Sequence, residues 1–152
     1  MLEESLLDCL SRTLYRRVLE RFAEWISFAE ITGDDVSEGR SILFKVPQPG
    51  SDRFLWVSTE GDEVTISFDK WHCHESAWLE DEEPTVDANI ARRSIELIDD
   101  ILSESEVVVV RFQNGTWTGS TLQAATEIVE PASGEVVHVL SWRGTFNRLV
   151  SA

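Results

Sequence analysis

The sequence predicts a single α+β domain over residues 1–152, in which a mostly antiparallel sheet of about six strands packs against two helices. Three observations predict this fold class. Apolar residues recur at helical spacing in two long segments. Glycine-containing turns at Glu60-Gly61 and Asn114-Gly115 join segments typical of β-strands. No internal repeat or linker divides the 152 residues, so we expect the order α-β-β-β-α-β-β-β.

Residues 2–30 are predicted to form the first helix. Its apolar stripe follows three- and four-residue steps and contains Leu2, Leu6, Leu10, Leu14, Val18, Phe22, Ile26 and Ala29. Gly33 and the acidic pair after it end the helix. Such an amphipathic helix needs a sheet or a second helix against its apolar side.

Three strands are expected next, at residues 41–46, 53–59 and 63–75. The third reads E-V-T-I-S-F-D-K-W-H-C-H-E and alternates with a period of two, so Val64, Ile66 and Phe68 share one face. Continued without interruption, this alternation carries His72 and His74 onto the same apolar face. If the two histidines serve the fold, we therefore expect both imidazoles to be mostly buried.

The second half of the chain begins with a loop of consecutive acids, after which Thr85 caps a helix that ends near Ser103. The run E-V-V-V-V-R-F at residues 106–112 suits a central strand covered on both faces. Asn114-Gly115 turns the chain into a strand at residues 117–122, with Gly119 suggesting a bulge, and a further strand follows at residues 136–143.

The net charge of −15 is the strongest global signal, since 28 acids stand against 13 lysines and arginines. Residues 34–105 contain 18 of those acids and only six bases. Nucleic acid and anionic membranes are poor partners for such a surface, whereas a basic protein suits it. Solubility alone is the other interpretation of this charge.

Cysteine usage and the N-terminus indicate the cellular compartment. Cys9 and Cys73 lie far apart and do not form a disulfide framework, which is typical of a reducing cytoplasm. The start M-L-E-E-S has no basic region, and no apolar run approaches the ~20 residues of a membrane span. We therefore expect a cytoplasmic protein without a signal peptide.

The histidines provide the one candidate metal site. His72 and His74 lie two residues apart on a predicted strand, a spacing that can hold a metal ion, and His138 is the remaining histidine. Three imidazoles would form an open site for zinc or another divalent metal in a metal-binding protein or metal-dependent enzyme. The alternative is that these side chains pack among the tryptophans. Cys73 is interpreted as a small buried residue, because its strand neighbours point away from it.

A family resemblance rests on the motif F-D-K-W-H-C-H-E, the helix I-A-R-R-S-I-E-L-I-D-D-I-L-S-E and the following F-Q-N-G. Over residues 54–117 the chain resembles small bacterial immunity proteins found beside polymorphic toxins. The resemblance implies an inhibitor rather than an enzyme, with no cofactor. It also implies that the partner is a toxin domain, often a basic nuclease.

The leading hypothesis is therefore a cytoplasmic immunity-type protein that binds and occludes a basic toxin domain. Trp78 is the candidate anchor, because tryptophans dominate binding hot spots, although core packing also accounts for it. Clustered acids are expected to steer the partner; they are Glu80, Asp81, Glu82, Glu83, Glu96, Asp99, Asp100 and Glu104. The oligomeric state is left open.

Overall fold

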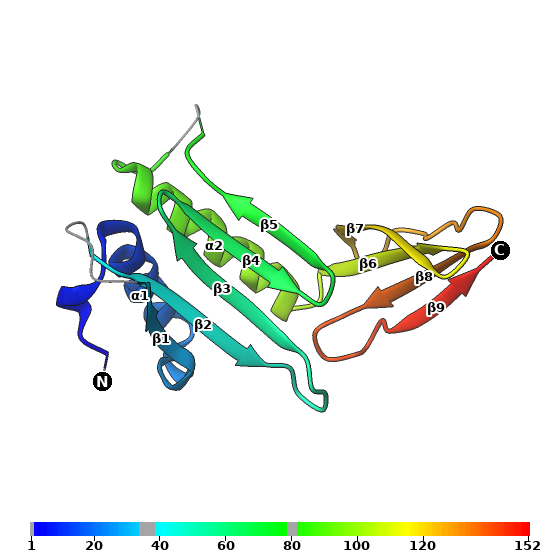
Figure 1. The fold of residues 1–152 in the computed structure, drawn as a ribbon, viewed down its shortest axis with the longest axis horizontal. Helices are drawn as coiled ribbons and strands as arrows, with labels where there is room; N and C mark the ends of the chain where they lie inside the picture. The colour runs from blue at the N-terminus through cyan, green and yellow to red at the C-terminus, as the bar shows by residue number, and fades with distance from the viewer. Residues whose placement is uncertain (1, 34–38, 79–81) are drawn as a thin grey trace.

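The computed structural model describes residues 2–33, 39–78 and 82–152, and over these residues the chain is an α+β domain (Figure 1). The elements follow in the order η1 (Glu4–Leu6), α1 (Cys9–Arg21), η2 (Ala23–Phe28), β1 (Ala29–Thr32), β2 (Ser41–Pro47), β3 (Phe54–Glu60), β4 (Glu63–Phe68), β5 (Trp71–Glu75), α2 (Val86–Leu102), β6 (Glu106–Gln113), β7 (Thr116–Ala124), β8 (Glu135–Leu140) and β9 (Arg148–Ser151). The predicted fold class is confirmed. No helix in these ranges is both long and apolar enough to cross a membrane.

The strands form two antiparallel sheets instead of the single sheet that we expected. The first has the order β1-β2-β3-β4-β5, and the second has the order β7-β6-β8-β9. Helices α1 and α2 lie side by side against one face of the first sheet (Figure 1). The second sheet follows α2 in the chain and extends away from the two helices.

The main core lies between the helices and the five-stranded sheet. Residues such as Leu14 of α1, Ile98 of α2 and Ile66 of β4 are fully buried there. The second sheet joins this core through Trp142, whose ring lies 5.6 Å from that of Phe68. This aromatic contact is one of several that join the second sheet to the main core.

The valine run of β6 is covered on both faces, as predicted. Val108 and Val110 belong to the main core, whereas Val107 and Val109 belong to a second cluster with Val129. All four β6 valines are at most 1% exposed. The hairpins at Gly61 and at Asn114-Gly115 are also confirmed, because both glycines and Asn114 have the positive φ angles that tight turns require.

The first helix is shorter than predicted. Asp8 caps α1 by accepting a hydrogen bond from the Ser11 backbone N–H at 2.7 Å, and Phe22 leaves the helical conformation with φ −133° and ψ 65°. The Phe22 ring then stacks on Trp25 of η2, 4.7 Å away, so the chain turns back onto the core before β1. The apolar spacing of residues 2–30 therefore spans three helical segments and part of a strand.

The predicted strand at residues 63–75 is a hairpin. Asp69, with φ 54°, and Lys70 form a tight turn, so that Phe68 of β4 lies opposite Trp71 of β5. Because partners across antiparallel strands share a face, Trp71 and Cys73 now face the core. His72 and His74 face the solvent. The expectation that these imidazoles are buried was wrong, since the turn resets the alternation.

Candidate functional site

The structure brings His72 and His74 together but not His138. The rings of His72 and His74 lie 5.2 Å apart on edge strand β5. His74 Nδ1 lies 3.0 Å from Glu63 Oε1 and 2.9 Å from Thr65 Oγ1. His138 is on β8 of the other sheet, with its ring against Phe112. No three histidine, cysteine or acidic side chains in the described part of the chain form a group suited to a metal ion.

Cys73 has the properties of a packing residue. Its side chain packs against the main core. Burial, together with the negative charge of Glu75, raises the pKa of the Cys73 thiol to about 11, despite a hydrogen bond with the Ile66 backbone that lowers it. A thiol of this pKa is almost fully protonated at neutral pH and is therefore a poor nucleophile.

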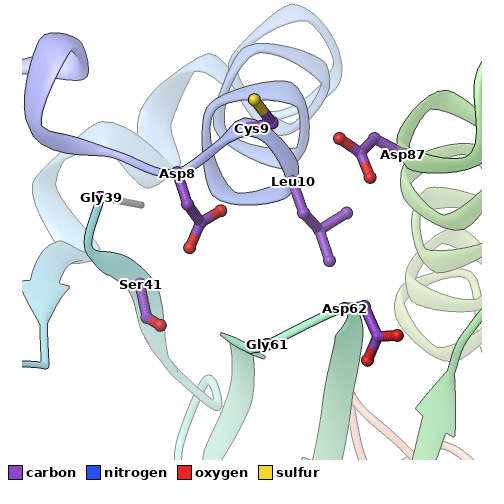
Figure 2. Close-up of a pocket in the computed structure, with 8 residues that line it drawn as sticks. All are labelled: Asp8, Cys9, Leu10, Gly39, Ser41, Gly61, Asp62 and Asp87. Carbon is purple, nitrogen blue, oxygen red and sulfur yellow. The ribbon is translucent and has the colours of Figure 1, made fainter. Parts of the chain in front are cut away.

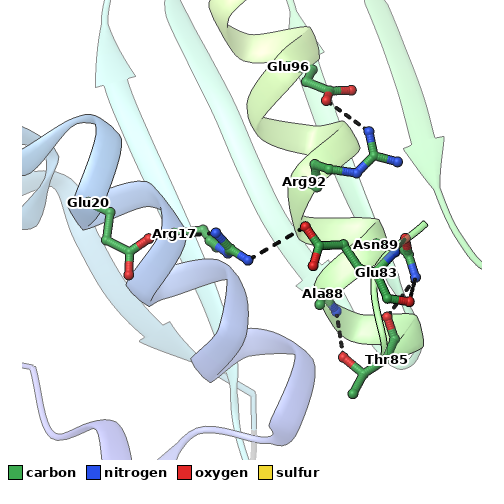
Figure 3. A network of polar contacts seen from close by, with 8 residues as sticks. All are labelled: Arg17, Glu20, Glu83, Thr85, Ala88, Asn89, Arg92 and Glu96. Carbon is green, nitrogen blue, oxygen red and sulfur yellow. Dashed lines mark hydrogen bonds and ion pairs between the residues drawn. The ribbon is translucent and has the colours of Figure 1, made fainter. Parts of the chain in front are cut away.

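Several acids assigned to partner binding are paired with arginines of α1 and α2 (Figure 3). Glu83 lies 3.8 Å from Arg17 of α1, and Glu96 lies 2.8 Å from Arg92 on its own helix. Asp99 likewise pairs with Arg21 at 2.8 Å. These carboxylates are partly neutralised within the protein, which reduces the field that they project toward a partner.

The remaining acids of that set have different environments. Glu80 and Asp81 lie outside the described residues, and Glu82 is exposed. Asp100 is exposed and accepts a hydrogen bond from Ser105 Oγ at 3.0 Å. All of the described acids in this group remain near the surface, with one exception.

Glu104 is that exception, and its assignment to a binding surface was wrong. The residue is only 6% exposed, and its carboxylate accepts hydrogen bonds from the backbone N–H groups of Arg143 and Thr145. Glu104 stabilises the fold because it satisfies these groups where α2 meets the second sheet. It is not available for contact with a partner.

Trp78 does not belong to the core. Its side chain is 65% exposed, and the guanidinium of Arg93 lies 5.4 Å from the centre of its ring. An exposed tryptophan is costly in water and gains most when a partner covers it. Its exposure makes Trp78 available as an anchor.

Three carboxylates that the sequence did not group together line a pocket of about 760 Å³ (Figure 2). Asp8 comes from the start of α1, Asp62 from the turn between β3 and β4, and Asp87 from the first turn of α2. In Figure 2 the Leu10 side chain is drawn between Asp8 on one side and Asp62 and Asp87 on the other. Cys9, Leu10 and Ser41 form parts of its wall.

The backbone near Gly39 fixes one side of this pocket. Asp8 N–H donates to Arg40 O at 3.0 Å, and Arg40 N–H donates to Leu6 O at 2.8 Å. The two segments approach so closely that a Cβ atom on Gly39 would lie 2.5 Å from the backbone nitrogen of Asp8. Gly39 also has φ +99°, so only glycine suits this position. The close contact fixes the backbone of Asp8, which is one of the residues that line the pocket.

The electrostatics of the pocket favour a cation. Partial burial and the negative charge of Asp8 raise the pKa of Asp87 above its ordinary value. Of the described residues that line the pocket, none is basic. Carboxylates at helix N-termini are favourable, which accounts for Asp8 and Asp87. Asp62 lies in a turn outside any helix, so the helix dipoles do not account for it.

Comparisons with protein-family models, with curated proteins and with solved structures found no match. The pocket is therefore interpreted from its own geometry. Sequence reasoning missed it because a helix cap, a turn residue and a first-turn acid each have an ordinary local role. Only the packing of α1 and α2 on one sheet brings the three carboxylates together.

Proposed function

We propose that this protein is an immunity-type inhibitor that binds a basic toxin domain in the cytoplasm and covers its active surface. The observation that carries the proposal is the pocket of Asp8, Asp62 and Asp87, which has three carboxylates and no basic residue among the described residues that line it. A lysine or arginine side chain of the partner supplies the missing positive charge. The net charge of −15 and the resemblance to toxin-immunity proteins support the same proposal.

Inhibition follows from binding alone. A basic active surface attracts its substrate through positive charge, and an acidic protein seated on that surface both neutralises the charge and blocks access. The pocket holds one cationic side chain of the toxin. Trp78 contributes apolar contact area, since its ring is already mostly exposed.

The test begins with capture of the partner from the cell in which the protein occurs. The captured protein is identified by mass spectrometry, and its toxicity is measured with and without co-expression of the present chain. We expect one basic partner whose toxicity is suppressed. Recovery of chaperones alone, or a partner whose toxicity is unchanged, would contradict the proposal.

Two variants that remove the same charge then test whether the partner binds at the pocket. One variant combines Asp8→Asn, Asp62→Asn and Asp87→Asn. The control removes the same total charge from exposed acids outside the pocket, at Glu24→Gln, Glu30→Gln and Glu130→Gln. We expect the pocket variant to weaken binding at least ~100-fold, because each charged contact in a binding site contributes on the order of 1 kcal/mol or more. Equal losses in both variants would show that overall charge acts, and that the pocket does not.

A further inference from the structure

β7 differs from the other edge strands of the described structure. β1, β5 and β9 are four, five and four residues long, and each contains a charged residue, at Glu30, Glu75 and Arg148. β7 is nine residues long, and its sequence T-W-T-G-S-T-L-Q-A has neither charge nor proline. Proteins normally protect sheet edges with short length, charge or proline. By these criteria β7 is unprotected.

The outer edge of β7 has no strand beside it in the described part of the chain. β7 pairs with β6 alone, and the sheet ends there. In Figure 1 this sheet extends away from α1 and α2. β5 of the first sheet approaches β7 but does not pair with it, so the outer side of β7 has no hydrogen-bonded strand among the described residues.

A bulge limits the part of β7 that can pair. Arg111 of β6 lies opposite Gly119, and Phe112 lies opposite Trp117, so Thr118 is the extra residue. Bulges twist an edge and hinder pairing, which restricts regular pairing to residues 119–124. This segment, G-S-T-L-Q-A, has the length of an average strand.

We propose that β7 pairs antiparallel with β7 of a second copy of this chain, within residues 119–124 and with Thr121 opposite Thr121 of that copy, joining two four-stranded sheets into one. Antiparallel pairing of a strand with its own copy has two-fold symmetry, so each hydrogen bond occurs twice. The exposed Trp117, 51% accessible, lies just before the paired segment and gains cover from the second copy.

The charge distribution favours a second copy over the basic partner at this edge. Two molecules of charge −15 repel one another, so a stable contact between them must avoid the acids. Residues 119–124 carry no charge, and residues 106–152 contain four acids against three bases. Pairing through β7 therefore keeps the acid-rich part of each copy away from the contact. An uncharged strand offers a basic partner no attraction.

Analytical ultracentrifugation of the protein alone tests the pairing over a range of concentrations. Thr121 is exposed on β7, and Thr121→Lys places two like charges near the two-fold axis. We expect the wild-type chain to dimerise and this variant to dimerise at least ~10-fold more weakly. The matched control is Thr32→Lys on edge strand β1, which should leave the dimer unchanged. A wild-type chain that is monomeric throughout would overturn the proposal, as would a dimer insensitive to Thr121→Lys.

Hydrogen exchange on the unmodified chain gives a second readout that does not depend on a variant. Amides of residues 119–124 should exchange more slowly at high protein concentration, whereas those of β1 should not change. Added salt should strengthen the dimer because it screens repulsion between the acidic copies, and it should weaken binding of a basic toxin. The results can therefore contradict the proposed dimer without contradicting the proposed toxin complex, and the reverse. Exchange rates that do not depend on concentration would contradict the pairing.

Discussion

Glu104 Oε1 accepts a hydrogen bond from the backbone N–H of Arg143 at 2.7 Å, across 39 positions of the sequence. The bond joins the residue after the C-cap of α2 to the loop between β8 and β9. Glu104 has φ 62°, a left-handed conformation that is uncommon outside glycine. The fold accepts this conformation because the carboxylate satisfies two backbone donors at the junction of the two sheets.

Removal of the Glu104 carboxylate should destabilise the protein. Glu104→Ala leaves the N–H groups of Arg143 and Thr145 without their acceptor, and we expect a loss of about 1.5–3 kcal/mol in the free energy of unfolding. Glu96→Ala, which removes an exposed ion pair with Arg92, should cost less than about 1 kcal/mol. Urea denaturation of both variants measures the difference. Equal losses would show that the buried bonds contribute little.

The Glu104 carboxylate should contribute to the loss of unfolding free energy at acid pH. Burial by itself raises the pKa of Glu104, but hydrogen bonds from Thr145, Ser141 and the Arg143 backbone outweigh it, and the pKa is lowered from 4.5. Its stabilisation is therefore complete above pH 4.5 and is lost as the pH falls through the lower folded-state pKa. Glu104→Gln should lack this part of the decline in urea titrations at several pH values. An unchanged decline would contradict the assignment.

How far the sequence predicts the fold is shown by two neighbouring segments. The turn at Gly61 was recognised because glycine marks a position of positive φ. The turn at Asp69 and Lys70 was missed, since neither residue is glycine or proline and the alternation of residues 63–75 continues through it. Local pattern cannot reveal a turn of this kind. As a result, His72 and His74 were placed on the wrong face.

The candidate site was less predictable than the fold. Glu96 and Asp99 were recognised as acids on a helix face, but Arg21, the partner of Asp99, became visible only once α1 packed beside α2. The pocket depends on the close approach of Gly39 to Asp8, which is a tertiary contact. Sequence reasoning therefore predicted the sign of the charged surface but not the location of its concave part.

Two substitutions of Asp8 should separate its role as the helix cap from the role of its charge in the pocket. Asp8→Asn retains an effective helix cap, so the unfolding free energy should change by less than about 1 kcal/mol, whereas Asp8→Ala should cost about 0.5–2 kcal/mol. Loss of the Asp8 charge should also lower the pKa of Asp87, leaving burial as its remaining cause of elevation. Carboxyl NMR titration measures this pKa. An Asp87 pKa unaffected by Asp8→Asn would show that the two carboxylates are not coupled.

The two cysteines should react at different rates. Cys9 is exposed, whereas burial and Glu75 raise the pKa of Cys73 to about 11. We expect Cys73 to react with a thiol reagent near pH 8 at least ~10-fold more slowly than Cys9, because both access and thiolate content are reduced. Labelling followed by mass spectrometry measures each site, with Cys9→Ser and Cys73→Ser as matched controls. If Cys9 and Cys73 react at comparable rates in the folded protein, the packed environment assigned to Cys73 is contradicted.

For the complex with the basic toxin, we expect the exposed acids to act mainly on the association rate and Trp78 to act mainly on the dissociation rate. Exposed acids such as Glu82 act over the Debye length, which falls from ~10 Å at 0.1 M salt to ~3 Å at 1 M. Neutralising residues 80–83 with Gln or Asn should therefore slow association and flatten its salt dependence. Trp78→Ala should instead accelerate dissociation, because the ring is mostly exposed in the free protein and gains further contacts in the complex. Surface-binding kinetics at several salt concentrations separate the two effects. The control of equal charge combines Glu24→Gln, Glu30→Gln, Glu127→Gln and Glu130→Gln at exposed positions. An on-rate indifferent to salt and to these neutralisations would leave the acidity of residues 80–83 as a determinant of solubility alone.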